Sequence, residues 1–229
     1  MTKNETRGDH QKEKMIKVAR ELFATQGFEA TTTRKINKEA GTAEGLLYYY
    51  FPHGKHEILD TIVYRGIMNR MNPVQISFEG CQTISDLENR LMTVFERVWQ
   101  VFQDEASYQS FMITIRERML LSDKQADWLM QVLESLVSMI SAQFKTIATI
   151  LPVDATQYRP LARVITSIYQ KVIYDELLIR NNREMTPAIK AALRPQLQLV
   201  LGLLQTAWLT KKVLFWRGSD PVRIALFWN

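Results

Sequence analysis

The stretch that decides the fold runs from Thr31 to Phe51 and reads TTTRKINKEAGTAEGLLYYYF. Its three leading threonines supply the hydroxyl groups that cap a helix N-terminus. Ile36 and Ala40 lie four residues apart, which gives the helix that follows one apolar face. Gly41 stands where that helix should end, because glycine tolerates the left-handed conformation of a helix C-terminus.

A second short helix is expected after this glycine. We predict that it begins at Thr42 and turns Ala43, Leu47 and Phe51 inward, since these residues recur every four positions. Three consecutive tyrosines spread over about 200° of a helix, so we expect Tyr50 to pack and the other two to face outward. The predicted outward set is Thr42, Glu44, Gly45, Leu46, Tyr48 and Tyr49. Two short helices about a glycine are typical of a helix-turn-helix, whose second helix enters the DNA major groove.

The composition indicates a soluble globular protein. Of 229 residues, 46% are hydrophobic and 23% are charged, which argues against disorder. The net charge of +5 mildly favours a polyanionic partner, but residues 1–60 contain ten basic and nine acidic side chains. A DNA-binding surface must therefore arise from local placement of residues such as Arg34, Lys35 and Lys38.

Several kinds of site are not expected. The single cysteine, Cys81, excludes an intramolecular disulfide and a CxxC metal site. His53 and His56 lie three residues apart without a third ligand, so we interpret them as loop histidines and expect no metal and no cofactor. The N-terminus lacks the apolar core of a signal peptide, and the most apolar window, residues 197–209, is too short to cross a bilayer. We expect a cytoplasmic protein.

Apolar residues at helical spacing continue along most of the chain. We expect further helices at about residues 11–26, 55–71, 85–104, 108–119, 122–147, 157–181 and 187–216, with a loop at 74–83. Ser85 with Glu88 has the spacing of a capping box, and Pro195 should kink or restart the last helix. No stretch alternates with period two, so the sequence predicts an all-α fold.

Two helices carry specific expectations about packing. The stripe Tyr108, Phe111, Met112, Ile115 and Met119 predicts the buried face of the helix at 108–119. The helix at 187–216 is apolar around nearly its whole circumference, so it must be covered on every side. We therefore expect it, together with residues 157–181, to form a four-helix bundle with a second copy of the chain.

The N-terminal motifs resemble the DNA-binding domain of TetR-type (TetR/AcrR) transcriptional regulators. The resemblance covers about residues 9–69 and rests on a combination of motifs. These are A-x-x-L-F at Ala19, Leu22 and Phe23, G-F at Gly27 and Phe28, I-x-x-x-A-G at Ile36, Ala40 and Gly41, G-x-L-Y-x-x-F from Gly45 to Phe51, and Lys55 at the start of the next helix.

This resemblance implies a domain organisation and a function. Residues 1–69 would form the DNA-binding domain, with the helix-turn-helix at about 32–51, and residues 70–229 a helical ligand-binding and dimerisation domain. The protein would be a homodimeric regulator, which we expect to be a repressor released from a pseudo-palindromic operator by a small molecule. The alternative is an architectural DNA-binding protein without a ligand. No enzyme is expected, because all three histidines lie in the N-terminal region and no catalytic set accompanies them.

The resemblance also implies DNA-contacting residues. Thr32, Thr33 and Arg34 would approach phosphates, Tyr48 mainly phosphates, and Lys55 a phosphate at a helix N-terminus. Thr42, Glu44, Gly45, Leu46 and Tyr49 would face the groove. Three residues depart from the family pattern: Asn37 replaces the usual alanine, Thr42 a hydrophobic residue, and Glu44 a common lysine or arginine. Glu44 would be repelled by phosphate but can accept from a cytosine amino group, so it is a candidate specificity residue.

Aromatic residues of the C-terminal region are candidates for lining an effector pocket, since such pockets are chiefly apolar. They are Trp99, Phe102, Tyr108, Phe111, Trp128, Phe144 and Tyr169, with Asp175 as a polar candidate. The effector is therefore expected to be apolar or aromatic. For Asp175 two interpretations stay open: an i,i+4 pair with Lys171 at the dimer seam, or a carboxylate that meets a cationic ligand.

Overall fold

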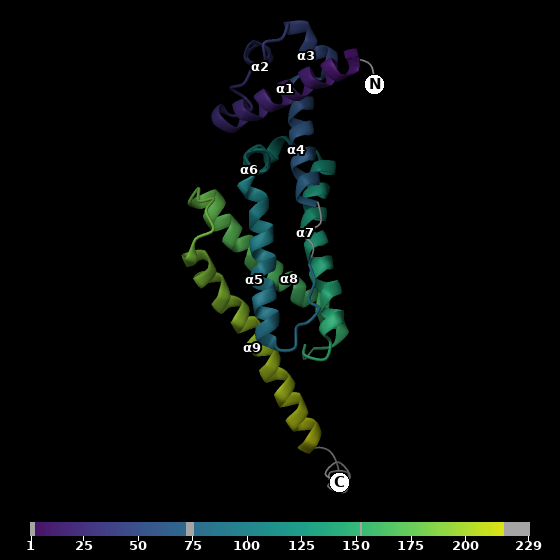
Figure 1. Ribbon diagram of the computed structural model, residues 1–229, viewed down its shortest axis with the longest axis vertical. Coiled ribbons are helices and arrows are strands. Elements are labelled where there is room, and N and C mark those ends of the chain that lie inside the picture. Colours follow the sequence, from purple (N-terminus) through teal and green to yellow (C-terminus); the bar gives the residue numbers. More distant parts are fainter. Residues whose placement is uncertain (1–2, 72–75, 152, 218–229) are drawn as a thin grey trace. The chain divides into compact units, whose positions relative to one another are not determined.

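The computed structural model describes residues 3–71, 76–151 and 153–217 (Figure 1). Within these ranges every regular element is helical, which confirms the all-α prediction. The α-helices are α1 (Lys3–Gln26), α2 (Thr33–Ala40), α3 (Glu44–Tyr50), α4 (Lys55–Met71), α5 (Ile84–Gln100), α6 (Glu105–Arg116), α7 (Asp123–Phe144), α8 (Tyr158–Ile173) and α9 (Pro187–Arg217). Short 3-10 turns, η1 to η4, occupy Val101–Gln103, Arg118–Leu120, Lys145–Ile147 and Ala155–Gln157, and the π-helical segment η5 spans Tyr174–Ile179. None of these described helices is long and apolar enough to cross a membrane.

The chain forms two compact units. The N-terminal unit comprises residues 1–74 and 97–135, and the C-terminal unit comprises residues 75–96 and 136–229. The boundary at residue 69 that the sequence suggested stays a prediction. Helix α6 and the first half of α7 belong to the same compact unit as the N-terminal helices. This unit is therefore larger than the helix-turn-helix region.

Helices α1 to α4 enclose the core of the N-terminal unit. Its buried apolar residues include Met15, Ala19, Phe23, Phe28, Ile36, Leu47, Phe51, Ile58, Leu59, Ile62 and Val63. Those of α1 and α4 recur at helical spacing, which is the signal that predicted these two helices. Helix α1 begins at Lys3 rather than near Gln11. Apolar periodicity detects only the packed part of a helix, and residues 3–10, KNETRGDH, contain no large apolar residue.

A bidentate ion pair joins α1 to α4. The Arg65 guanidinium donates to both carboxylate oxygens of Glu13 over 2.6 and 2.7 Å. The hydrogen bond from Arg65 is the largest cause that lowers the pKa of the Glu13 carboxyl. Because both side chains are about half exposed, the pair adds only a small stabilisation, which is present at neutral pH and is lost in acid as Glu13 protonates.

Helix α6 packs against α1 and α4 through small residues. Its buried residues are Ser107, Ser110, Ile113 and Thr114, whereas Met119, just beyond the helix, is 84% exposed. The predicted stripe from Tyr108 to Met119 is therefore wrong. At the closest approach, a Cβ added to Gly66 of α4 would lie 2.6 Å from the Cβ of Ser110. Only small side chains fit there, so the packed face carries little hydrophobic signal.

The end of α6 also satisfies backbone groups at the end of α1. The Arg116 guanidinium donates to the carbonyl oxygens of Phe23 and Ala24. The neighbouring Glu117 carboxylate accepts from the backbone N–H of Phe28 over 3.3 Å. Carbonyl groups in the last turn of a helix lack intrahelical partners, so these contacts fix α1 on α6.

In the C-terminal unit, the loop before α5 and the helix start differ from the expectation. Residues 76–83 are non-helical, as predicted, but Phe78 is fully buried and packs near Phe144. Thr83, not Ser85, caps the helix: its hydroxyl accepts from the Asp86 backbone N–H over 3.1 Å, and Asp86 accepts from the Thr83 backbone N–H over 2.9 Å. Glu88 is thereby free of a capping role.

Helices α5, α8 and α9 pack around buried polar contacts. The Tyr169 hydroxyl donates to the Leu91 carbonyl over 2.7 Å, and burial raises the pKa of this hydroxyl. The Glu88 carboxylate accepts from Arg194 and Gln198 of α9. Helix α9 runs through Pro195, so the predicted restart does not occur. Pro195 is exposed, and the alternative, a kink at this residue, stays a prediction.

Candidate nucleic-acid interface

The turn between α2 and α3 has the geometry expected of a helix-turn-helix. The Thr32 hydroxyl caps α2 by accepting from the Lys35 backbone N–H over 3.1 Å. Gly41 ends the helix in the left-handed conformation, with a φ of 65°. Its N–H bonds back to the carbonyls of the last turn, as in a glycine-terminated helix. The predicted caps of α2 are confirmed.

Helix α3 begins two residues later than predicted. Glu44 is its first residue and Ala43 is the N-cap, without a side-chain capping bond. The Thr42 hydroxyl lies before the N-cap and donates to the Asn37 side-chain oxygen over 2.9 Å. Leu47 and Phe51 are buried as expected, but Ala43 is exposed, so its predicted inward position is wrong.

The predicted DNA contacts form a largely exposed surface on α2 and α3. Tyr48 and Tyr49 are 53% and 76% exposed. Thr32, Arg34, Glu44 and Gly45 are also exposed, and Thr33 and Thr42 are half-buried. Leu46 is half-buried against the apolar core and Tyr50 packs there too, so Leu46 presents only part of its side chain. The Thr33 and Tyr48 hydroxyl oxygens lie 3.5 Å apart.

Asn37 and Thr42, two of the departures from the family pattern, bond to each other. Asn37 is 2% exposed, and its side-chain oxygen accepts from the Thr42 hydroxyl. Its side-chain nitrogen lies 3.4 Å from the Glu44 carbonyl oxygen, to which it donates. The Thr42 backbone N–H also donates to the Asn37 carbonyl over 2.9 Å. The two replacements therefore form one polar bridge that fastens the turn to α2.

This bridge predicts a strong coupling between the two positions. Asn37→Ala and Thr42→Val each leave a polar partner unpaired, and each should lower the free energy of unfolding by about 1–3 kcal/mol. The double variant should lose at least about 1 kcal/mol less than the sum of the two, because the bond between the two side chains is then removed from both sides. Urea unfolding measures these values. Pairing Asn37→Ala with Thr25→Val, which touches neither residue, should be additive; additivity for Asn37 with Thr42 would contradict the bridge.

The third departure, Glu44, pairs with Arg34. The Arg34 Nε lies 3.3 Å from a Glu44 carboxylate oxygen, and the two side chains are 87% and 71% exposed. An ion pair this exposed contributes only about 0–1 kcal/mol to stability. Glu44 and Arg34 are therefore positioned beside each other without being needed to hold the fold.

Lys55 has a structural role that the sequence analysis missed. Its ammonium group donates to the Phe28 carbonyl over 2.9 Å and to the Glu29 carbonyl over 3.4 Å. It also lies 4.2 Å from the centre of the Phe28 ring. The side chain is only 21% exposed, so Lys55 connects the start of α4 to the first residues of the α1–α2 loop. A phosphate contact by Lys55 stays a prediction.

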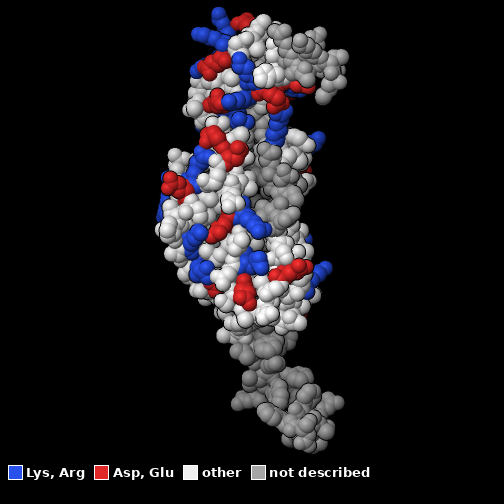
Figure 2. Space-filling view, viewed as in Figure 1, with Lys and Arg blue, Asp and Glu red and all other residues white. Residues whose placement is uncertain are grey.

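Positive and negative charges are mixed on the face of the protein that Figure 2 shows, including its N-terminal part. This agrees with the near-neutral balance of residues 1–60. Contacts with a polyanion must therefore come from individual residues, such as Arg34 of α2, whose side chain is 87% exposed.

The predicted effector residues are spread over both units. Trp99, Phe102, Phe144 and Tyr169 are buried, and Tyr108, Phe111 and Trp128 are half-buried. Phe144, Tyr169 and Asp175 belong to the C-terminal unit and the others to the N-terminal unit. Asp175 accepts from the Lys171 ammonium over 2.5 and 2.6 Å, which is the i,i+4 pair considered above. A ligand contact by any of these residues stays a prediction.

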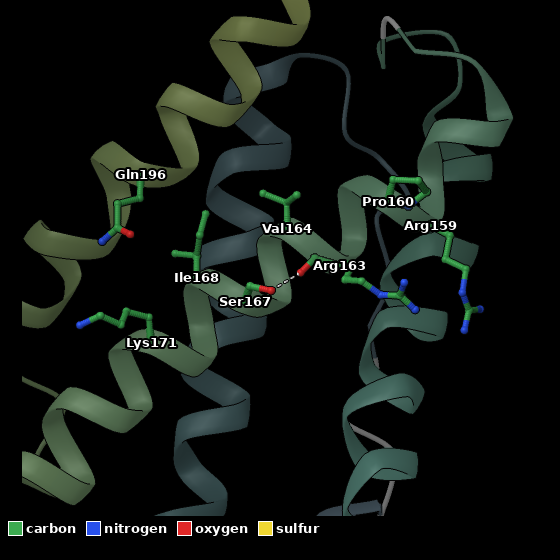
Figure 3. A pocket seen from close by; sticks show the side chains of 8 residues that line it. All are labelled: Arg159, Pro160, Arg163, Val164, Ser167, Ile168, Lys171 and Gln196. Carbon is green, nitrogen blue, oxygen red and sulfur yellow. Dashed lines mark hydrogen bonds between the residues drawn. The ribbon is translucent and has the colours of Figure 1, made fainter.

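A groove that the sequence analysis did not identify lies on α8 and α9. Its volume is about 600 Å³, and it is lined by Arg159, Pro160, Arg163, Val164, Ser167, Ile168, Lys171 and Gln196 (Figure 3). It is open to solvent and combines apolar side chains with three cations. None of the predicted effector residues lines it. Across the described ranges, no His, Cys, Asp or Glu side chains gather in a group of three or more that could hold a metal ion.

The N-terminal region matches known regulators. Residues 15–62 match the family model for bacterial regulatory proteins of the tetR family. Over 62 residues, 27% of this chain, it is 42% identical to the uncharacterised HTH-type transcriptional regulator YxaF of Bacillus subtilis (strain 168). Over 47 residues, 20% of this chain, it is 43% identical to HTH-type transcriptional regulator LmrA of the same organism. These matches span 32% and 25% of the two relatives.

Solved structures resemble the chain over most of its length. Salmonella enterica GusR has a TM-score of 0.57 at 20% identity, with 84% of this chain and 95% of GusR covered. A TetR/AcrR-type regulator from Aquifex aeolicus VF5 has a TM-score of 0.56 at 19% identity, with coverages of 83% and 99%. SmeT in complex with triclosan has a TM-score of 0.53 at 18% identity, with coverages of 86% and 91%. At these identities the likeness concerns the fold. The match at residues 15–62 identifies a helix-turn-helix domain of the tetR family of bacterial regulatory proteins, and the chain as a whole resembles regulators of this family in fold.

Proposed function

We propose that this protein is a ligand-responsive repressor that binds a twofold-symmetric DNA operator as a homodimer. The observation that carries the proposal is the α2–Gly41–α3 motif with Arg34, Tyr48 and Tyr49 exposed on its surface. In a helix-turn-helix the second helix enters the major groove, and a dimer reads half-sites about one helical turn apart. Polar and basic groups beside α3 position the helix on phosphates, and side chains at its start reach base edges.

The salt dependence of DNA binding tests the interface at a single residue. We expect Arg34→Ala to reduce the slope of log affinity against log salt by about 0.9 for each phosphate that Arg34 neutralises. Fluorescence anisotropy with a labelled operator duplex measures this slope. Lys145→Ala, which removes an exposed cation of the C-terminal unit, is the matched control and should leave the slope unchanged. Equal slopes for Arg34→Ala and the parent would remove Arg34 from the phosphate contacts.

The proposed dimer interface lies on α8 and α9. Leu199 and Leu203 are 65% and 61% exposed, and Val164 of α8 is 48% exposed. Leu199 follows Gln196 by three residues and Leu203 follows Leu199 by four, so both continue along α9 the face that borders the groove. An exposed apolar face of this kind is typical of a surface that a second subunit covers.

A charge on this face should separate the subunits. We expect Leu203→Glu to weaken the dimer by about 100-fold or more, because the symmetric interface would bury two unpaired carboxylates. Sedimentation equilibrium measures the dissociation constant. Met119→Glu places the same charge on an exposed apolar site of the N-terminal unit and should not change it. A dimer that tolerates Leu203→Glu as well as Met119→Glu would contradict this interface.

Release by a small molecule requires different affinities for two conformations of the dimer. The ligand would favour a conformation whose half-site spacing no longer fits the operator. SmeT, whose fold is similar, was solved in complex with triclosan, which supports an apolar or aromatic effector. Titrating such compounds into the protein–operator complex tests the release. Equal affinity for operator and unrelated DNA would favour the architectural alternative instead.

A further inference from the structure

Helix α3, which we propose enters the major groove, begins with an acidic side chain that contributes little to the stability of the fold. Glu44 is the first residue of α3, and its exposed carboxylate contacts only the exposed guanidinium of Arg34 among the interactions described for it. A surface pair of this kind contributes little to stability, so both groups can exchange it for other partners. The carboxylate of Glu44 is therefore available to whatever α3 contacts.

The backbone of Glu44, in contrast, is firmly positioned. Its carbonyl oxygen accepts from the side chain of Asn37, which is buried. The side-chain oxygen of Asn37 also accepts from the Thr42 hydroxyl, and its backbone carbonyl accepts from the Thr42 backbone N–H. The bridge thus fixes where α3 starts. A side chain whose base is fixed while its tip is free suits the reading of a base edge at one defined position.

The chemistry of the major groove restricts what a carboxylate can contact. Phosphates, the N7 and O6 atoms of guanine and the O4 atom of thymine are all acceptors and repel it. The donors are the amino groups of cytosine and adenine. In adenine the acceptor N7 lies beside the amino group, whereas cytosine presents its amino group without a neighbouring acceptor on the same base. A carboxylate on α3 therefore favours cytosine.

We propose that Glu44 selects a cytosine at one fixed position of each operator half-site, and that Arg34 moves from Glu44 to a phosphate when DNA binds. Asn37 acts as a positioning residue for this contact. The inference rests on the proposed function, because it requires α3 to lie in the major groove. It goes beyond that function by naming the base and the residue that reads it.

Selection of DNA sequences tests the assignment. Wild-type protein, Glu44→Ala, Glu44→Gln and Glu39→Gln each select from the same library of twofold-symmetric duplexes with randomised half-sites. Glu39 is an exposed acid of α2, so Glu39→Gln is the matched control and should select the wild-type sequence. We expect the wild type to require cytosine at one position, with a loss of roughly 5- to 150-fold when that base pair is replaced.

The variants separate the contact from its alternatives. Glu44→Ala should lose the preference at that position alone, and Glu44→Gln should change it to adenine, which glutamine reads through N6 and N7. Arg34→Ala should keep the cytosine preference. An unchanged preference in Glu44→Ala would overturn the inference while leaving the proposed function intact. If the wild type selects no sequence at all, the proposed function itself fails.

Discussion

Replacing Phe28 by alanine is expected to lower the free energy of unfolding of the N-terminal unit by about 3–5 kcal/mol. Phe28 is fully buried, and its ring lies 5.1 Å from the ring of Phe23 and 4.8 Å from that of His56. The Lys55 ammonium lies over the same ring. Truncation would leave a cavity where the end of α1 meets the start of α4 and would remove the cation–π contact.

Urea unfolding followed by far-UV circular dichroism measures this loss. Phe28→Leu keeps most of the apolar volume and should cost about 1.5 kcal/mol or less beyond the lost cation–π contact. Phe78→Ala, which truncates a fully buried phenylalanine of the C-terminal unit, should be comparably destabilising. As urea unfolds the Phe28→Ala variant, DNA binding should be lost together with the folded N-terminal unit. A change of less than 1 kcal/mol for Phe28→Ala would show that this ring does not hold the helix-turn-helix against α4.

Gly66→Val should be the most disruptive change at the contact of α4 with α6. The added Cβ alone would lie 2.6 Å from the Cβ of Ser110, so the helices must separate or tilt. We expect a loss of about 3 kcal/mol, at the upper end of the range for overpacked sites. Valine has a better helix propensity than glycine by only a few tenths of a kcal/mol, which does not offset this loss. Thermal and urea unfolding both measure it.

Two further variants distinguish crowding from a general effect of glycine. Gly202 lies in α9 with no atom within 4 Å of an added Cβ, so Gly202→Ala should stabilise by about 0.5–1 kcal/mol. Ser110→Gly removes the group that Gly66→Val meets, and combining the two should recover part of the loss. If Ser110→Gly only adds its own destabilisation to that of Gly66→Val, crowding at this crossing is not the cause.

The sequence predicted those features that depend on apolar spacing and backbone preference. Helices α1, α4 and α8 were located by their buried stripes, and Gly41 marks the end of α2 because few other residues adopt its conformation so readily. The face of α6 was predicted wrongly because Ser107, Ser110 and Gly66 allow a close approach without an apolar pattern. Spacing alone does not reveal a contact formed by small residues.

The candidate site shows the same division. The exposure of Tyr48 and Tyr49 follows from their positions about 100° and 200° around α3 from the buried Leu47. The hydrogen bond between Asn37 and Thr42 does not follow from the sequence. In the sequence each residue is a separate departure from the family pattern, and nothing indicates that the two side chains meet. Lys55 carries a positive charge suited to phosphate, but its contacts with the Phe28 and Glu29 carbonyls depend on how the α1–α2 loop folds. Such long-range polar contacts require the three-dimensional arrangement.

The most direct test of the account is the affinity and stoichiometry of binding to a twofold-symmetric duplex taken from DNA upstream of the protein's own gene. Anisotropy at physiological salt gives the affinity, and sedimentation gives the number of chains on each duplex. The account predicts two chains, or a multiple of two, and binding about 10³-fold or more tighter than to the same bases in scrambled order. Equal affinity for the symmetric and the scrambled duplex, or one chain bound to each duplex, would contradict it.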